Sequence, residues 1–412
     1  MEGLYTPSFW KTTFVMASTR AHINPDMLVW ARRRVNATPE QVARRVGTSL
    51  DVVQQWEAGE KRPTIKQLRT VAKYLERPVS HFYLDEPPDE LAPRIEMRRV
   101  FGGDPVSDSF DFAREVQRCM RRRQVSRDLF ERLGETPPSL PEPFDATEDP
   151  EEVAATVRAN LLSVDINEQV GWKGAYEALR SWREAVERAG ILSFQLSGIP
   201  ISEARGFSVA NRPLPLVAFN SSDSVRGRIF TLFHEVAHVL LGISTLHSRS
   251  PFESDDDTEQ WCNRLAAAIL IPKEDLLSLY QVQTLGPSAS WSQQKVERLA
   301  HRYGVSPAAM VRRLDTFDRT TSGVFHELRE MFDQRRSNEE LSDTKDGPGG
   351  GNFYTTRLTQ LGSLLPSLAF RGFYANAISA GDLSEIMGTK VKNLGTFEQK
   401  VMGSRYAFSD EE

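Results

Sequence analysis

The chain has 412 residues, of which 40% are hydrophobic and 26% charged, and its formal net charge is −5. This length is too great for one ordinary domain and predicts two or three. Its two cysteines, Cys119 and Cys262, are too few for a disulfide framework and indicate a reducing compartment. No apolar run reaches the ~20 residues needed to cross a membrane, and the start of the chain lacks the apolar region of a signal peptide. We therefore expect a soluble cytoplasmic protein without a membrane partner.

Composition divides the chain into five regions. Stretches rich in proline, glycine and acidic residues (DEPPDELAPR, GETPPSLPEPFDATEDP and SNEELSDTKDGPGGGN) separate segments with helical or alternating patterns. In the second region we expect the basic run RCMRRRQ to lie on an exposed helix face. The expected regions are a basic helical domain (24–85), a charged helical linker region (86–149), a large domain (150–335), a flexible linker (336–351) and a helical C-terminal region (352–412).

The first region is the most basic, because residues 27–80 contain 11 Lys and Arg but only 5 Asp and Glu. Such a charge favours nucleic acid or an acidic partner. Thr38 and Gln41 predict a capping box for a helix that ends at Gly47, and a second helix is expected over 50–58. Two short helices joined by a glycine turn predict a helix-turn-helix.

Residues 27–82, with the exit WEAGEKRPT and the closing FYL, resemble the XRE family of Cro- and repressor-like domains. The resemblance implies that the second helix lies in the major groove of double-stranded DNA, and it makes a homodimer a candidate assembly. Asp51 would be repelled by phosphates and Leu50 can contact little beyond a thymine methyl, and this departure from the polar residues usual in the family weakens the case for DNA binding. Phosphate contacts driven by the basic charge are better supported than base contacts. The alternative is that this unit binds protein or only packs. The expected DNA-contacting residues are Ser49, Leu50, Asp51, Gln54, Gln55, Lys61 and Arg62.

The large domain opens with a helical pattern, YEALRSWREAVERAG, and continues with three alternating runs, ILSFQL, GFSVA and LPLVAFN. These runs predict strands of a small sheet, whereas everything after Ser224 looks helical. An α+β domain is expected, within a multidomain and mainly α protein. The helix pair VERLAHRYGVSPAAMVRRL could be a second helix-turn-helix carrying Arg312 and Arg313, but packing within the domain is the favoured interpretation.

The stretch RIFTLFHEVAHVLLG (228–242) places three ionisable residues in an otherwise apolar helix. His234 and His238 are four residues apart, so they share one helix face and can hold one ion. Glu235 would project beside that ion, where it can act on a bound water. Burying these groups without partners is costly, and a divalent metal would satisfy them. Core histidines that hydrogen-bond to the backbone are the alternative.

A catalytic zinc site takes three protein ligands and keeps one open position, which leaves one ligand to find. Glu259 begins the next predicted helix, in SDDDTEQWCNRLAAAILIP, and lies 21 residues after His238. The neighbouring acidic residues 255–257 are alternatives that spacing does not exclude. Asn263 follows one turn after Glu259 on the same face, where its amide could orient that carboxylate.

FTLFHEVAHVLLG followed by EQWCNRLAAAILIP resembles the ImmA/IrrE family of metallopeptidases, and the similarity extends over roughly residues 150–335. The resemblance implies a zincin-like fold with one zinc ion per chain, held by His234, His238 and Glu259, and it makes Glu235 the catalytic acid/base. It also implies a protein substrate, typically a transcriptional repressor cleaved under stress, and the XRE-like module is a familiar companion of this domain.

Two functions of different classes fit these motifs. The first is a zinc-dependent endopeptidase that cleaves a regulatory protein and thereby controls transcription. The second is a non-hydrolytic DNA-binding regulator or antitoxin-like protein that keeps the metallopeptidase fold for binding. His247, expected in the loop between the two ligand helices, is a candidate oxyanion donor, although a solvent-exposed role is favoured. ISAGDLSEIMGTKVKNL in the C-terminal region predicts an amphipathic helix whose role the sequence leaves open.

Overall fold

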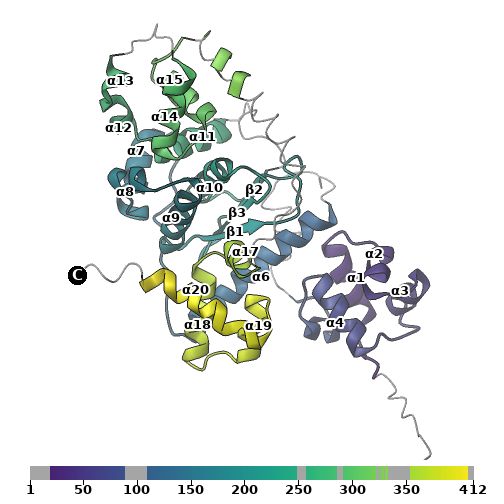
Figure 1. Cartoon of the computed structure of the whole chain (residues 1–412). Helices are drawn as coiled ribbons and strands as arrows, with labels where there is room; N and C mark the ends of the chain where they lie inside the picture. Colours follow the sequence, from purple (N-terminus) through teal and green to yellow (C-terminus); the bar gives the residue numbers. More distant parts are fainter. Residues whose placement is uncertain are drawn as a thin grey trace, which may run out of the picture. The chain divides into compact units, whose positions relative to one another are not determined.

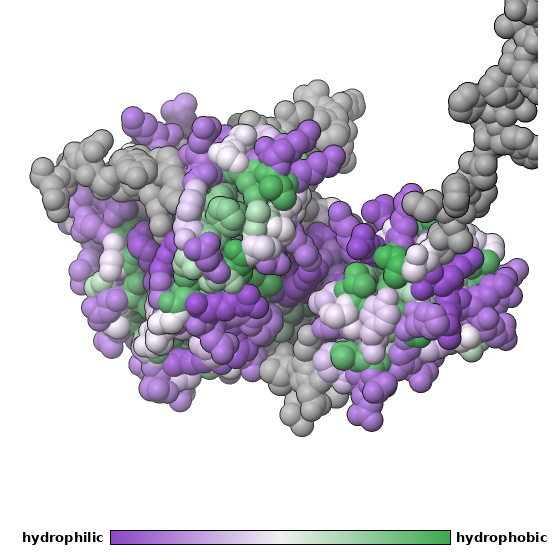
Figure 2. Space-filling view, turned by 90° about the horizontal axis from the view of Figure 1, so that it is seen from below, coloured by the Kyte–Doolittle hydropathy of each residue, from purple (hydrophilic) through white to green (hydrophobic). Residues whose placement is uncertain are grey.

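The computed structural model describes residues 19–88, 109–247, 257–284, 291–332 (without 322, 324, 325 and 329) and 353–406. The chain divides into two compact units, residues 1–92 and 93–412, which are described separately (Figure 1). On the faces shown in Figure 2, hydrophilic residues prevail and apolar residues form smaller patches. Within the described ranges, no helix is both long enough and apolar enough to span a membrane.

The first unit is an all-helical bundle built around a helix-turn-helix. The α2 helix begins at a capping box, in which Thr38 Oγ1 accepts from the Gln41 amide and the Gln41 side chain accepts from the Thr38 amide. It ends at Gly47, whose φ of 74° is a left-handed conformation that glycine adopts without strain. Val53 and Trp56 of the second helix are fully buried, so the predicted helix-turn-helix is confirmed. The elements of this unit are α1 (Pro25–Arg34), α2 (Pro39–Val46), α3 (Leu50–Glu57), α4 (Ile65–Tyr74) and η1 (Val79–Tyr83).

The second unit contains a four-stranded sheet in the order β1-β3-β2-β4. β1 and β3 are parallel, whereas β2 is antiparallel to both β3 and β4. The first three strands fall in the three predicted alternating runs. The fourth corrects the expectation that everything after Ser224 is helical, and it places His247 in an edge strand rather than in a loop. The strands are β1 (Leu192–Leu196), β2 (Gly206–Val209), β3 (Leu216–Asn220) and β4 (Thr245–His247).

Helices cover both faces of this sheet, with α9 and α10 on one face and α6 and α18 on the other (Figure 1). Successive side chains of a strand therefore point into different cores. Val217 and Phe219 of β3 pack into the core around α10, whereas Leu216 and Ala218 pack into the core with α6 and α18. The sheet is therefore the middle layer of three. The helices named are α6 (Phe110–Arg132), α9 (Ala175–Arg188), α10 (Val225–Leu240) and α18 (Leu364–Tyr374).

The α6 helix contains the basic run RCMRRRQ, which was expected on an exposed face. Here the structure corrects the prediction, because Cys119, Arg122 and Arg123 are all buried. Arg123 donates to the backbone carbonyl of Leu214 at 2.7 Å, and Arg122 donates to that of Gln360 at 3.2 Å. A guanidinium can be buried in this way when its donors find acceptors and its stem covers apolar surface.

The C-terminal helices belong to the same compact unit as the sheet. Buried Glu187, at the end of α9, accepts hydrogen bonds from the Ser193 hydroxyl (2.5 Å) and from the backbone amides of Ser363 (2.7 Å) and Leu364 (2.8 Å). These bonds fix the start of α18 against α9 and β1. Phe397, far along the chain, is fully buried in the core that α6 and α18 form on their face of the sheet.

The remaining helices pack on both faces of the sheet: α7, α11, α14 and α15 share the core of α10, whereas α17, α19 and α20 share the core of α6 and α18. The helix pair α14 and α15 was favoured as a packing element, and Arg313 of α15 is only 2% exposed. It pairs with Glu151 at 2.6 Å and donates to the carbonyl of Ile271, so it has no free donor face for DNA. These elements are α7 (Pro150–Thr156), η2 (Val157–Leu162), α8 (Ile166–Gly171), α11 (Asp257–Leu270), α12 (Lys273–Ser278), α13 (Tyr280–Gln283), α14 (Gln293–Tyr303), α15 (Pro307–Thr316), α17 (Phe353–Leu361), α19 (Ala380–Met387), η4 (Val391–Asn393) and α20 (Leu394–Tyr406).

Candidate metal centre

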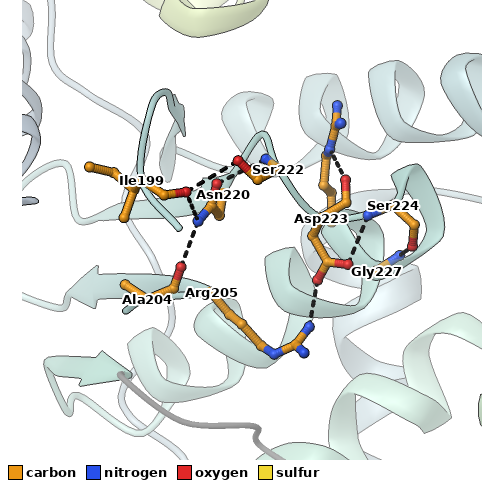
Figure 3. Close-up of polar contacts among 9 residues, drawn as sticks. Ile199, Ala204, Arg205, Asn220, Ser222, Asp223, Ser224 and Gly227 are labelled. Carbon is orange, nitrogen blue, oxygen red and sulfur yellow. Dashed lines mark hydrogen bonds and ion pairs between the residues drawn. The ribbon is translucent and has the colours of Figure 1, made fainter. Parts of the chain in front are cut away.

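The candidate site lies on α10, and a polar network at the end of β3 fixes where this helix starts (Figure 3). Ser224 caps the helix, because its hydroxyl accepts from the Gly227 amide at 3.1 Å. The Asp223 carboxylate accepts from the Ser224 amide and from Arg205, each at 2.8 Å. Arg205 immediately precedes β2, so the network ties α10 to the sheet.

The same figure shows how Asn220 organises the connection before the helix. Its amide nitrogen donates to the carbonyls of Ile199 (3.0 Å) and Ala204 (2.7 Å), and its amide oxygen accepts from the Ser222 backbone at 2.9 Å. A Cβ at Gly227 would lie 2.4 Å from the Asp223 carboxylate, so this close approach requires glycine. Both ends of the β3–α10 connection are therefore held firmly.

The α10 helix is almost entirely buried from Ile229 onward, which explains its apolar sequence. His234, Glu235 and His238 are each only 1% exposed. Near the start of the helix, burial lowers the pKa of the Arg228 guanidinium, which donates to the Asp223 carbonyl at 2.7 Å. Three ionisable side chains in such an environment need polar partners, and they find them in α11 and the sheet.

The two histidines and Glu259 bring their ligand atoms to one point. The Nε2 atoms of His234 and His238 lie 3.2 Å apart. Glu259 Oε2 is 3.2 Å from Nε2 of His234, and Oε1 is 3.4 Å from Nε2 of His238. A tetrahedral zinc ion with bonds of ~2.0–2.1 Å keeps its ligand atoms about 3.3 Å from one another. The three residues thus form a cluster that could bind a metal ion, and its spacing fits zinc.

The other imidazole nitrogens contact residues of α11. Asn263 Oδ1 lies 3.0 Å from Nδ1 of His234, and Cys262 Sγ lies 3.5 Å from Nδ1 of His238. Residues three and four positions after Glu259 share its helix face, so one helix supplies all three contacts. We expected the amide of Asn263 beside Glu259, whereas the contact described here joins it to His234. The contact of Cys262 was not predicted, although its spacing of three from Glu259 could have indicated it.

Strands β2 and β4 contact Glu235 on the side of the sheet. The Thr245 hydroxyl donates to Glu235 Oε2 at 3.1 Å, and the Ser208 hydroxyl lies 2.9 Å from that of Thr245. A Cβ at Gly206 would lie 3.1 Å from Glu235 Oε1 and 2.7 Å from the Ala218 carbonyl. None of these strand residues was predicted to belong to the site. Thr245 lies in a strand of three residues that shows no recognisable alternation, and the run that predicted β2 does not indicate what its residues contact.

The predicted DNA-contacting residues lie together in the first unit. Ser49 is the N-cap of α3, which carries Leu50, Asp51, Gln54 and Gln55, and Lys61 and Arg62 lie in the segment that follows this helix. Asp51 and Glu57 are the only charged residues of α3, and Glu57 pairs with Arg32 at 2.6 Å. The α3 helix itself therefore offers no cation to a phosphate, and these DNA contacts stay predictions.

A buried H-E-x-x-H helix on a small sheet, preceded by a helix-turn-helix, defines a metallopeptidase-like domain joined to a DNA-binding type of domain. Comparison with protein families agrees: residues 187–315 match the IrrE N-terminal-like peptidase domain, and residues 28–82 match the helix-turn-helix family. A search of curated proteins gives no match. The chain thus combines an XRE-type domain with a domain of the IrrE-like metallopeptidase family, as its motifs predict.

Proposed function

We propose that this protein is a cytoplasmic zinc-dependent endopeptidase that cleaves a regulatory protein, a transcriptional repressor by family analogy, and so controls transcription, typically under stress. The observation that supports it most is the ligand triangle of His234, His238 and Glu259, with separations of 3.2–3.4 Å. Glu235 neighbours this triangle on the same buried helix. Two imidazoles and one carboxylate are a donor set that zinc favours, and one ion per chain is expected.

The hydrogen bonds around the histidines prepare them as ligands. If Nδ1 of His234 donates to Asn263 Oδ1, its Nε2 carries a lone pair directed at the cluster. Cys262 contacts Nδ1 of His238 in the corresponding position. Zinc, when bound, would supply the Lewis acid that polarises the attacking water and the peptide carbonyl.

Glu235 is proposed as the general acid and base. Its carboxylate would take a proton from the attacking water and then deliver it to the nitrogen of the leaving amine, so that the peptide bond is hydrolysed. The hydrogen bond from Thr245 holds Oε2 and thereby fixes the orientation of the carboxylate. Burial of Glu235 strengthens this hydrogen bond relative to one in water.

The helix-turn-helix would bring the peptidase to a promoter, or to a repressor bound there, by contacting double-stranded DNA through residues 24–85. Domains of this type commonly bind as dimers, which would also make a homodimer of this chain the DNA-bound form. Cleavage and DNA binding are then two activities of one regulator.

The test measures metal and cleavage on the full chain. Elemental analysis of the wild type and Glu235→Gln should find about one zinc per chain. His234→Ala and Glu259→Ala should lose it, whereas the exposed control His301→Ala should keep it. In cells that express the protein, new protein N-termini should appear with the wild type and His301→Ala but not with Glu235→Gln.

The outcomes separate the two candidate functions. Zinc binding without any cleavage that depends on Glu235 would favour the non-hydrolytic regulator. Wild-type protein that takes up no metal, even after zinc is supplied and the excess removed, would overturn the peptidase proposal.

A further inference from the structure

The first unit has a surface depression that lies outside the predicted recognition helix. Four cationic side chains line it, and we name it the cationic groove: Arg45 from α2, with Lys66, Arg69 and Lys73 from α4. Ile65 is the only apolar side chain among its lining residues. A surface of this composition recognises a ligand by charge, because protein partners generally require apolar or aromatic anchors.

The arrangement of the cations follows from the helix period. Lys66, Arg69 and Lys73 occupy positions i, i+3 and i+7 of α4, so they form one row along about 10 Å of helix. Arg45 comes from the neighbouring helix, and its guanidinium lies 5.9 Å from the ring centroid of Tyr74. The groove is thus a row of positive charge with a fourth cation beside it.

The far wall of the groove is held in place by backbone hydrogen bonds. The Ala21 amide donates to the Pro63 carbonyl at 2.8 Å, and the Ile65 amide donates to the Thr19 carbonyl at 3.0 Å. Residues 19–21 therefore lie along the start of α4. This wall is built before any ligand arrives.

The charge of the groove is not neutralised internally. All four cations are exposed, and in the part of the chain that the structure describes no ion pair joins any of them to a carboxylate. The backbone amides at the start of α4 are not the main attraction for an anion, because Thr64 and Gln67 form a capping box that satisfies two of them. The four side chains are the source of the positive potential.

We propose that the cationic groove binds the phosphate backbone of double-stranded DNA and contributes more binding free energy than α3 does. The inference rests on the proposed DNA-binding role and changes where the binding energy comes from. One strand of DNA carries a phosphate about every 3.4 Å along the helix axis, so a row of about 10 Å is long enough to contact more than one phosphate. The α3 helix, in contrast, has acidic Asp51 and Glu57 and no cation. This surface therefore gives affinity that does not depend on base sequence.

The test measures the affinity of the full chain for a fluorescent 30-base-pair duplex of random sequence, by anisotropy at several KCl concentrations. The groove variant is Lys66→Gln/Arg69→Gln. The matched control, Arg33→Gln/Arg44→Gln, removes two exposed cations outside the groove and has the same net charge. A third variant, Gln54→Ala/Gln55→Ala, removes polar side chains of α3.

Loss of two phosphate contacts should make the negative slope of log K, the association constant, against log [KCl] less steep by about 1.8. It should also weaken binding by about 60-fold at 0.1 M KCl. The matched control and the α3 variant should stay within about threefold of the wild type. The charge-conserving variant Lys66→Arg/Arg69→Lys should bind as the wild type does, and equal melting curves would exclude a folding defect.

Other outcomes overturn the proposal. If the groove variant binds the duplex as well as its matched control, or the α3 variant loses more affinity, the groove is not the phosphate site although DNA binding stands. If the wild type binds no duplex at all, the DNA-binding part of the proposed function fails as well. A fluorescent 20-residue poly-glutamate peptide is measured in parallel. Loss of peptide binding with unchanged DNA binding in the groove variant would assign the groove to an acidic protein and overturn the proposal.

Discussion

Thr245 and Glu235 are joined across the boundary between sheet and helix, because the Thr245 hydroxyl donates to the Glu235 carboxylate at 3.1 Å. The Ser208 hydroxyl of β2 lies 2.9 Å from the Thr245 hydroxyl, so residues of two strands together orient one carboxylate on α10. The orientation of the proposed acid/base therefore depends on the edge strand of the sheet.

Replacing Thr245 should impair the chemical step of the proposed peptidase without removing its metal. Thr245→Val deletes a hydrogen bond to a charged group, worth about 1.5–3 kcal/mol. We expect kcat to fall at least about tenfold while KM and zinc content stay unchanged. Thr245→Ser keeps the hydroxyl and should retain most of the activity. Equal activity of the Val and Ser variants, measured on the cleaved protein, would contradict this role.

Gly206 should tolerate no side chain, because a Cβ there would lie 2.7 Å from both the Ala218 carbonyl and Thr231 Cγ2. Since backbone and a buried helix must both move, Gly206→Ala should lower the free energy of unfolding by about 1–3 kcal/mol. Urea denaturation followed by circular dichroism measures this value. Gly171→Ala is the control, because nothing lies within 4 Å of its Cβ position. Equal stability of the two variants would show that the β2–α10 approach can relax.

Cys262 should support metal binding through His238, whose Nδ1 lies 3.5 Å from its sulfur. Removing a partner of a ligating histidine typically weakens metal affinity by about 10–100-fold, and we expect this for Cys262→Ala. Competition with a zinc chelator gives the affinity. Cys119→Ala removes the other buried thiol, which belongs to the core on the opposite face of the sheet, and should leave zinc affinity unchanged. If both variants release zinc equally, the effect comes from general destabilisation.

Glu184 of α9 should make stability depend on pH, because burial raises the pKa of its carboxyl above the usual value of 4.5. An acid with a raised pKa holds more protons in the folded state than in the unfolded state, so folding loses stability as pH rises through this range. Glu184→Gln should therefore gain stability relative to the wild type above pH 4.5 and show no such gain below it. Unfolding curves at pH 4 to 8, with exposed Glu131→Gln as control, measure the difference. A gain that does not vary with pH would exclude the titration of Glu184 as its cause.

Local patterns predicted the parts of the molecule that depend on neighbours in the chain. The capping box of Thr38 and Gln41 and the spacing of His234 and His238 are such patterns, and the three alternating runs predicted β1, β2 and β3. Selecting Glu259 from the acidic residues around it needed the family resemblance, because the packing of α11 against α10 is not encoded in spacing.

The features that were not predicted depend on contacts between distant segments. Thr245 lies in a strand of three residues, which is too short to show a period of two. Arg122 and Arg123 looked like a solvated basic face, but their acceptors are backbone carbonyls 88 or more residues away. Charge alone does not reveal such acceptors, since every residue carries a carbonyl.

One of the two faces of the sheet is covered by segments that lie far apart in the chain. Phe194 and Phe207 pack with Phe112 of α6 and with Phe397, whereas the peptidase family match covers only residues 187–315. During synthesis α6 precedes the sheet, but the cover of this face stays incomplete until Phe397 has been added. A nascent or prematurely ended chain would therefore present aromatic surface to chaperones and to the degradation machinery.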